Sequence, residues 1–396
     1  MKKRLLSVLL ASAMVMSLVA CGSSTETATT TEEPAATEEV VEVEEAVVEE
    51  ATEEVAEATG DETYHFEIVS KGFQSTYWQA VYVGAVAKID ELNAAAGYDK
   101  YSMNMVGPDS ESDIAVQVTM FTSALTSNPD AIGLAALDTS ALNDAIAQAQ
   151  SAGIPIIGFD SGVPDAAEGA VYANAATDNY AAGELAGESM YAAVADRFGA
   201  GQVRVGVVNQ DATAESIINR GLGFIDKMVE LATADGYTVA IVGNDKYVSD
   251  SVDATAEEAD ADIIIDVAVP SQTTVELCAT EASALLNKSD LTAIYGSNQV
   301  AAEGVVTANE TLQVLGSTAD DIIAVGFDSG TVLKAAVSSG VMYGAVTQAP
   351  VSIGSVLIEL LAASAAGEAV SDTDTGCAFY TAENIASDEI APNLYD

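Results

Sequence analysis

One pentapeptide whose residue types suit ligand binding occurs twice in the sequence. Gly-Phe-Asp-Ser-Gly stands at residues 158–162 and again at residues 326–330, each time at the end of an apolar run. A polar group at the carboxyl end of a parallel strand lies where open α/β sheets bind their ligands. The copies are 168 residues apart, about the length of one lobe. We therefore expect Asp160 and Asp328 on opposite walls of a cleft between two similar lobes, with a turn-capping role as the alternative for each.

The residue types that most catalytic or metal centres need are sparse. His65 is the single histidine, and it falls where the first strand begins, which favours a packing role over a serine–histidine triad. Asp372 and Asp374 before Gly376 lack the remaining ligands of a calcium loop. No phosphate-binding loop pattern occurs either. The sequence therefore predicts no cofactor, no metal and no enzymatic activity.

Cysteine is equally sparse. Apart from Cys21, the chain has only Cys278 and Cys377. These two cysteines could pair outside the cytoplasm, but the sequence gives no sign that they lie close together. Two buried free thiols are the preferred interpretation, with a disulfide as the alternative.

From residue 64 onward, short β-branched runs alternate with Ala-rich segments of helical period. This alternation predicts an α/β fold with parallel sheets and helices on both faces. The length after residue 62 exceeds one typical core, so two similar Rossmann-like lobes are expected. The predicted strands are His65–Ser70, Tyr101–Val106, Ala131–Leu134, Ile154–Phe159, Val203–Val208, Thr238–Val242, Ile263–Val267, Ala293–Tyr295 and Ile322–Phe327. The clearest predicted helices are Trp78–Ala94, Ala141–Ala152, Tyr180–Ala195 and Val300–Asn309.

The first 21 residues have the pattern of an export signal. Basic residues from Lys2 to Arg4 precede an apolar run from Leu5 to Val19. The run is too short for a membrane-spanning helix with proper flanks and is typical of a secretory signal peptide. Leu-Val-Ala before Cys21 resembles the lipobox of bacterial lipoproteins. That resemblance implies cleavage after residue 20 and a lipid such as palmitate on Cys21, whereas an ordinary signal with an incidental cysteine is the alternative.

Residues 22–62 are predicted to form a solvated tether that follows Cys21, the expected site of lipidation. They contain 15 acidic residues and no basic or aromatic residue. Charge of one sign disfavours collapse, although Val40, Val43 and Val47 fall at helical spacing and leave a transient helix open. The whole chain has a net charge of −48. Such a charge disfavours binding to nucleic acid or to anionic lipid headgroups.

Several short strings follow one another in an order that characterises a known family. They are Tyr77-Trp78, Gly84-Ala85, Leu-Ala-Ala-Leu-Asp at 134–138, Ala-Gly-Ile-Pro-Ile at 152–156, Thr177-Asp178-Asn179, Gly-Leu-Gly-Phe at 221–224, Ser297-Asn298, Val-Gly-Phe-Asp at 325–328 and Thr347-Gln348. On these strings, the chain from about Tyr64 to Ile385 resembles the sugar-binding, ribose-binding-protein-like branch of the type I periplasmic-binding-protein family. Their common order, rather than any single string, makes the resemblance specific.

The resemblance implies ligand contacts at eight residues. Aromatic rings suit the C–H faces of a sugar, whereas carboxylates and amides suit its hydroxyl edges. The residues expected to stack on the sugar are Tyr77 and Trp78, with Tyr247 as a looser match. The residues expected to bind its hydroxyl groups are Asp160, Ser161, Asn298, Asp328 and Gln348. A core position for Trp78 and a turn role for Asn298 are the alternatives.

Two departures from the ribose-binding pattern bear on the ligand. Ser161 and Ile218 stand where ribose-binding members carry arginines, so several hydrogen-bond donors are missing. Ribose and anionic ligands are therefore disfavoured, and a neutral monosaccharide or polyol is expected. Arg220 matches a structural ion pair, and Lys71 lies near the cleft mouth without an assigned role.

The resemblance implies an extracytoplasmic solute-binding lipoprotein, anchored to the cell membrane by its lipid. The expected first lobe comprises residues 63–177 and 349–377, and the second comprises 178–348 and 378–396. They are joined by crossings near Thr177, Gln348 and Cys377. Hinge closure around the ligand would let this monomer dock on the permease of an ABC importer.

Two other functions share this architecture. A sensor subunit that presents its bound ligand to a membrane receptor would use the same cleft and is the alternative. Lactose-repressor-type regulators need a DNA-binding helix-turn-helix before the lobes, where this chain has a signal and an acidic tether.

The lipid anchor is tested by Cys21→Ser. This variant is expected to escape lipidation and to be released from membranes, because the acceptor thiol is gone. Membrane fractionation and the mass of the processed N-terminus measure both effects, with Cys278→Ser as a control that keeps the acceptor. A Cys21→Ser protein that stays wholly in the membrane fraction with unchanged processing contradicts the lipobox interpretation.

Overall fold

The computed structural model describes residues 62–396. The predicted signal peptide, Cys21 and all but the last residue of the predicted tether lie outside these residues. Within them, no helix combines the length and the apolar character needed to cross a membrane.

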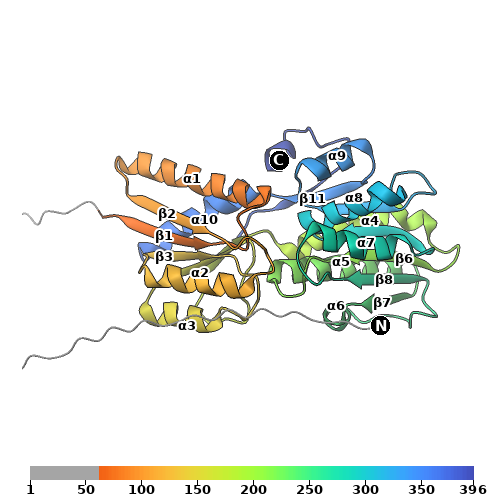
Figure 1. Ribbon diagram of the computed structural model, residues 1–396, viewed down its shortest axis with the longest axis horizontal. Coiled ribbons are helices and arrows are strands. Elements are labelled where there is room, and N and C mark those ends of the chain that lie inside the picture. Colours follow the sequence, from red (N-terminus) through yellow and green to blue (C-terminus); the bar gives the residue numbers. More distant parts are fainter. Residues whose placement is uncertain (1–61) are drawn as a thin grey trace, which may run out of the picture. The chain divides into compact units, whose positions relative to one another are not determined.

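The first lobe is built on a six-stranded sheet with strand order β12-β5-β4-β3-β1-β2. All of its strand pairs are parallel. Helices α1 and α10 cover one face of the sheet and α2 and α3 cover the other (Figure 1). Its strands are β1 (Tyr64–Val69), β2 (Tyr101–Val106), β3 (Ala131–Leu134), β4 (Ile156–Phe159), β5 (Ala173–Ala176) and β12 (Thr373–Asp374). Its helices are α1 (Thr76–Ala96), α2 (Ile114–Thr126), α3 (Asn143–Ala152) and α10 (Pro350–Ala365).

The second lobe is built on a seven-stranded sheet with strand order β13-β11-β10-β9-β6-β8-β7. Only β13 runs antiparallel to its neighbour. Helices α4 and α5 cover one face, and α7, α8 and α9 cover the other. Its strands are β6 (Val203–Val208), β7 (Val239–Gly243), β8 (Ile263–Ala268), β9 (Leu291–Gly296), β10 (Ile323–Phe327), β11 (Gly344–Gln348) and β13 (Cys377–Tyr380). Its helices are α4 (Asn179–Val194), η1 (Ala195–Arg197), α5 (Glu215–Ala234), α6 (Asp245–Asp250), α7 (Val275–Leu286), α8 (Gln299–Leu312), α9 (Thr331–Ser339) and η2 (Ala391–Asn393).

The predicted α/β fold is confirmed, because apolar runs form strands covered by helices on both faces. A strand in such a sheet is buried on both sides and so reads as a continuous apolar run, as the sequence of β10 does. All nine predicted strands and the four predicted helices are present, with ends that differ by at most three residues. Strands β5, β11, β12 and β13 were not predicted. β5 consists of three alanines and an asparagine and so lacks the β-branched composition of a strand, and the two residues of β12 are too few to form a recognisable pattern.

The chain passes between the two sheets at three places. β5 ends at Ala176 and leads into α4 of the second lobe, and β11 ends at Gln348 and leads into α10 of the first. The third passage joins β12, which ends at Asp374, to β13, which begins at Cys377. These places lie near the residues expected for the crossings. The limits of the lobes themselves stay a prediction.

Each lobe packs two helices closely through glycines. A Cβ atom on Gly84 of α1 would lie 2.0 Å from the carbonyl oxygen of Val351 in α10, and a Cβ atom on Gly354 of α10 would lie equally close to the carbonyl oxygen of Val81 in α1. Gly183 and Gly223 bring α4 and α5 together in the same way. Because α1 carries Tyr77 and Trp78 in its first turn, the α1–α10 contact determines where these two rings lie.

Gly84→Val is expected to destabilise the protein. The new side chain meets backbone rather than a flexible side chain, so helices α1 and α10 must separate. Overpacking of this kind typically costs about 1–3 kcal/mol, which lowers the Tm of a protein of this size by about 1–4 °C. Thermal unfolding followed by circular dichroism measures the change, with Ala94→Val at an exposed position of α1 as control. A Tm equal to that of the control would show that α1 and α10 do not pack this closely.

Candidate functional site

The two repeated aspartates share an uncommon backbone conformation. Asp160 directly follows β4 and Asp328 directly follows β10, with φ angles of 57° and 72°. Positive φ is rare outside glycine, although Asp tolerates it better than most residues. Both side chains are buried. The same unfavourable conformation at equivalent places in two lobes points to a shared functional demand.

A small cavity lies between the lobes at these strand ends. Its volume is about 30 Å³, which is room for about two water molecules. Six of the eight predicted ligand residues line it, namely Tyr77, Trp78, Asp160, Asn298, Asp328 and Gln348. The sequence placed Lys71 near the cleft and gave Arg220 a structural role, and both line the cavity. The remaining lining residues, which the sequence did not suggest, are Ser75, Glu111, Ile217, Gln299 and Val300.

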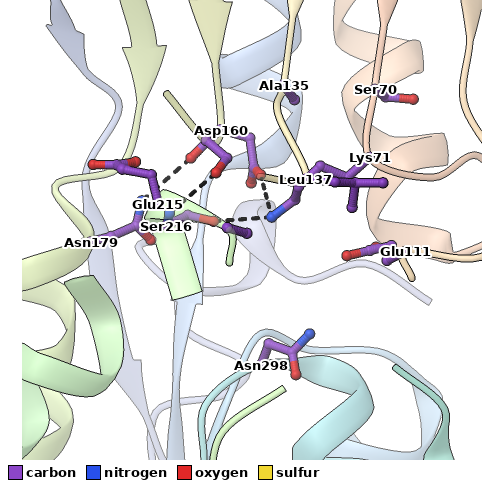
Figure 2. Close-up of polar contacts among 12 residues, drawn as sticks. Ser70, Lys71, Glu111, Ala135, Leu137, Asp160, Asn179, Glu215, Ser216 and Asn298 are labelled. Carbon is purple, nitrogen blue, oxygen red and sulfur yellow. Dashed lines mark hydrogen bonds and ion pairs between the residues drawn. The ribbon is translucent and has the colours of Figure 1, made fainter. Parts of the chain in front are cut away.

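The carboxylate of Asp160 is held by two groups of its own lobe. The hydroxyl of Tyr77 donates to Oδ1 at 2.5 Å, and Nζ of Lys71 lies 3.0 Å from Oδ2. Figure 2 shows the Lys71 side chain extending toward Asp160 and Ser216. Its ammonium group also donates to Oγ of Ser216 in the second lobe at 3.0 Å, so it links the two lobes directly.

Lys71 is protonated although it is buried. Burial alone lowers its pKa, but the carboxylates of Asp160, Glu111 and Asp211 outweigh that effect and raise its pKa above the ordinary value. An ammonium group with a raised pKa cannot serve as a general base toward Ser216. Lys71 therefore acts as a fixed positive charge, a role that the sequence did not reveal.

Trp78 lies on the same wall and is almost completely buried. Its indole Nε1 donates to Oε1 of Glu111 at 2.8 Å, and Oε2 of Glu111 accepts from Nε2 of Gln210 in the second lobe at 3.1 Å. The ring packs edge-on against Tyr77, with centroids 5.0 Å apart. Burial raises the pKa of Glu111, and the charge of Lys71 partly opposes this shift.

The carboxylate of Asp328 has a different set of partners. Nε2 of Gln348 donates to its Oδ1 at 2.7 Å, and the backbone N–H of Gln299 donates to its Oδ2 at 3.1 Å. Arg220 lies 3.8 Å from Oδ2. Burial raises the pKa of Asp328, and the positive charge of Arg220 opposes that shift.

Contacts within the second lobe hold the side chain of Arg220 more than its ion pair does. Its guanidinium carbon lies over the ring of Phe327, 3.6 Å from the centroid. It donates to Oδ1 of Asn179 and, at 3.0 Å, to the carbonyl oxygen of Ser297. The expected ion pair, with Asp328, is present but long. Stacking and hydrogen bonds to neutral groups hold this charge in place.

Two amide side chains leave acceptors free at the cavity. The NH₂ group of Gln348 faces Asp328, and that of Gln299 donates to Glu303 at 2.9 Å. Because each NH₂ group faces a carboxylate, the orientation of both amides is determined. Oε1 of Gln348 and Oε1 of Gln299 are buried without a hydrogen-bond donor. These oxygens suit a ligand that brings its own hydroxyl donors.

Asn298 combines a structural role with a place on the cavity wall. Its Oδ1 accepts from the backbone N–H of Ala301 and so caps α8, as the turn alternative proposed. Its Nδ2 donates to Oε1 of Gln210. One hydrogen of this NH₂ group is therefore engaged by protein, and the other is left for a ligand.

The structure does not bring Ser161 and Tyr247 to the cavity wall. Oγ of Ser161 accepts from the backbone N–H of Ser216 at 3.2 Å. Tyr247 is fully buried, and its hydroxyl donates to the carbonyl oxygen of Asp211 at 2.7 Å. Both side chains thus have protein partners, and their assignment as ligand contacts stays a prediction.

The histidine and cysteine expectations need correction in part. The side chain of His65 is 45% exposed, with its ring nitrogens near Ser102 and Glu67, so it does not pack in the core. Both cysteines are free, but only Cys278 is fully buried, whereas Cys377 is half-buried. Burial raises the pKa of Cys278 to about 12 and that of Cys377 to about 11. Across residues 62–396 no group of side chains suited to a metal ion occurs.

The comparisons with known proteins agree on one family. Residues 66–369 match the family described as periplasmic binding protein domain, whereas no curated protein matches. An ABC transporter, LacI family transcriptional regulator from Brachyspira murdochii is 32% identical, with a TM-score of 0.69 over 84% of this chain and 99% of that chain. An ABC transporter solute-binding protein from Agrobacterium vitis with bound D-fucose is 29% identical, with a TM-score of 0.68 over 84% and 100% of the two chains.

A more distant structure supports the fold alone. It is a carbohydrate transporter solute-binding protein from Agrobacterium radiobacter in complex with D-arabinose, 24% identical, with a TM-score of 0.67 over 84% of this chain and 99% of that chain. The family match covers every residue that lines the cavity and all strands of the two sheets except β12 and β13, apart from the first two residues of β1. The chain therefore belongs to the type I periplasmic binding protein family, whose members are solute-binding proteins and not enzymes.

Proposed function

We propose that the protein binds a neutral monosaccharide between its lobes and delivers it to an ABC importer. The observation that carries this proposal is the pair of buried aspartates at positive φ, one from each lobe, that face a single cavity beside Tyr77 and Trp78. Carboxylates suit sugar hydroxyl groups, and aromatic rings suit the C–H face of a sugar. The relative from Agrobacterium vitis, whose structure holds D-fucose, supports a ligand of this class.

The charges around the cavity favour an uncharged ligand. Asp160 has Lys71 as its counter-ion, and Asp328 has Arg220. An ionic ligand would need one of these buried groups to give up its partner, which is costly in a buried site. The free acceptors of Gln348 and Gln299 can instead be satisfied by hydroxyl groups.

Entry of the ligand requires the lobes to part. The cavity is far smaller than a sugar, and hydrogen bonds such as Lys71 to Ser216, Gln210 to Glu111 and Thr273 to Ser112 join the lobes around it. Opening breaks these bonds, and a ligand that contacts both walls favours reclosure. The chain crossings after β5, β11 and β12 are the proposed hinges.

The proposal extends to the residues before the lobes. A lipid on Cys21 and the acidic segment that follows would hold the binding lobes near a permease at the cell membrane. The export pattern and the lipobox resemblance in the sequence support this arrangement.

Asp160→Asn and Asp328→Asn test the cavity as the binding site. Asparagine keeps the size of the side chain and tolerates positive φ, so the substitution mainly removes charge. A hydrogen bond to a charged group is worth about 1.5–3 kcal/mol, so each variant is expected to bind about 10- to 100-fold more weakly. Calorimetry with a panel of neutral monosaccharides measures this, with the exposed Asp253→Asn as matched control.

Three results would contradict the proposal. If the protein bound an anionic sugar and none of the neutral ones, the inference that the paired charges favour an uncharged ligand would be wrong. If either variant bound with wild-type affinity, that aspartate would not be part of the binding site. Equal losses in Asp253→Asn would show a general effect of charge rather than a local one.

A further inference from the structure

The last residues of the sequence are anchored on the second lobe. Oγ1 of Thr347 donates to the carbonyl oxygen of Asn393 at 3.1 Å, and Ile390 and Leu394 pack in the core beside α8 and α9. The backbone N–H of Tyr395 donates to Oγ of Ser329 at 2.9 Å, and the N–H of Gly330 donates to the carbonyl oxygen of Tyr395 at 3.1 Å. Figure 1 shows this end of the chain beside α9. The backbone of Tyr395 is therefore tied to the loop that immediately follows Asp328.

The side chain of Tyr395 lies against the other lobe. It is 9% exposed and belongs to the core cluster that contains Tyr77, Trp78 and Ile353 of the first lobe. Its ring lies edge-on to that of Tyr77, with centroids 5.8 Å apart and an interplanar angle of 68°. Tyr395 thus connects the second lobe, through its backbone, to the aromatic wall of the first, through its ring.

The ring of Tyr77 is in turn connected to Asp160. The Tyr77 hydroxyl donates to Oδ1 of Asp160 at 2.5 Å. A continuous series of contacts therefore runs from Ser329, next to Asp328, through Tyr395 and Tyr77 to Asp160. Tyr395 does not line the cavity, so any effect on the ligand must pass through its neighbours.

We propose that Tyr395 is a positioning residue for ligand binding. When the lobes close, its ring seats against Tyr77 and holds the Tyr77 hydroxyl on Asp160, so the first-lobe contacts form only when the Asp328 loop is in place. When the lobes open, the ring leaves Tyr77. This inference rests on the proposed function, because it concerns how the same site closes on its ligand.

The ring, rather than the hydroxyl, carries the contact. The Tyr395 hydroxyl accepts from the backbone N–H of Ser329 at 3.4 Å, a long hydrogen bond. Tyr395→Phe is therefore expected to bind within about twofold of wild type. Tyr395→Ala removes the aromatic pair and is expected to bind about two- to tenfold more weakly, the range that such pairs are worth.

A double-mutant cycle with Tyr77→Ala tests whether Tyr395 acts through Tyr77. If it does, Tyr395→Ala causes a loss of affinity in the wild-type background and little further loss in the Tyr77→Ala background. Tyr343→Ala serves as control, because Tyr343 is an exposed tyrosine of the second lobe that packs on Phe379. Affinities are measured by calorimetry with the monosaccharide that the wild type binds.

The ligand-induced change in Trp78 fluorescence gives a second readout. A purely structural role of Tyr395 would leave this change as it is in the wild type. Trp78 is the only tryptophan of the chain, and its ring contacts that of Tyr77. At saturating ligand, Tyr395→Ala is expected to show a smaller emission change than wild type, and Tyr395→Phe is expected to restore it. Thermal unfolding of each variant identifies any that does not fold, in which case Tyr395→Leu, which retains bulk without the ring, replaces Tyr395→Ala.

The outcomes separate this inference from the proposed function. If the wild type binds no monosaccharide, the proposed function fails. If the wild type binds one and Tyr395→Ala matches it in affinity and emission, Tyr395 has no positioning role. Equal losses from Tyr395→Ala in the presence and absence of Tyr77 would also overturn the inference, because the effect would not pass through Tyr77.

Discussion

The site depends on one constraint, a carboxylate held at positive φ where a buried parallel strand ends. This conformation lets Asp160 and Asp328 leave their strands sharply and lie against the cavity rather than continue along the sheet. Burial makes an unpaired carboxylate costly, so each aspartate needs a cation and hydrogen-bond donors close by. Lys71 and Tyr77 meet this need on one wall, and Arg220 and Gln348 meet it on the other.

Each wall holds one buried aspartate with a cation and a hydrogen-bond donor, but the groups that do so differ between the walls. Asp160 is held by an ammonium group and a phenol, whereas Asp328 is held by an amide and a more distant guanidinium. The indole of Trp78 stands only on the first wall, where its N–H is taken by Glu111. Two nearly perpendicular aromatic rings therefore border the cavity on the side of the first lobe, whereas charged groups border it on both sides.

The sequence predicted the parts of the site that repeat or follow a strand, because backbone pattern alone places them. Asp160 and Asp328 were found in this way. Lys71 was placed near the cleft mouth without a role and Glu111 was not suggested, because a single charged residue beside a strand or helix usually belongs to a solvated surface, and only the tertiary fold brings these two to the cavity. Family position suggested Ser161 but could not give the direction of its side chain, which faces Ser216. The same limit applies to Tyr247 and to His65, whose surroundings come from distant segments.

The glycine contact between α1 and α10 has a consequence for how the chain is made. The first lobe is assembled from two stretches of sequence, with α10 and β12 supplied only after the whole central part of the second lobe. On the ribosome, one face of the early stretch therefore has only α1 to cover it until residue 365 has emerged. Contacts of such long sequence separation slow folding, and exposed apolar surface invites aggregation meanwhile. Export before folding, with help from a chaperone, would suit this topology better than folding during synthesis.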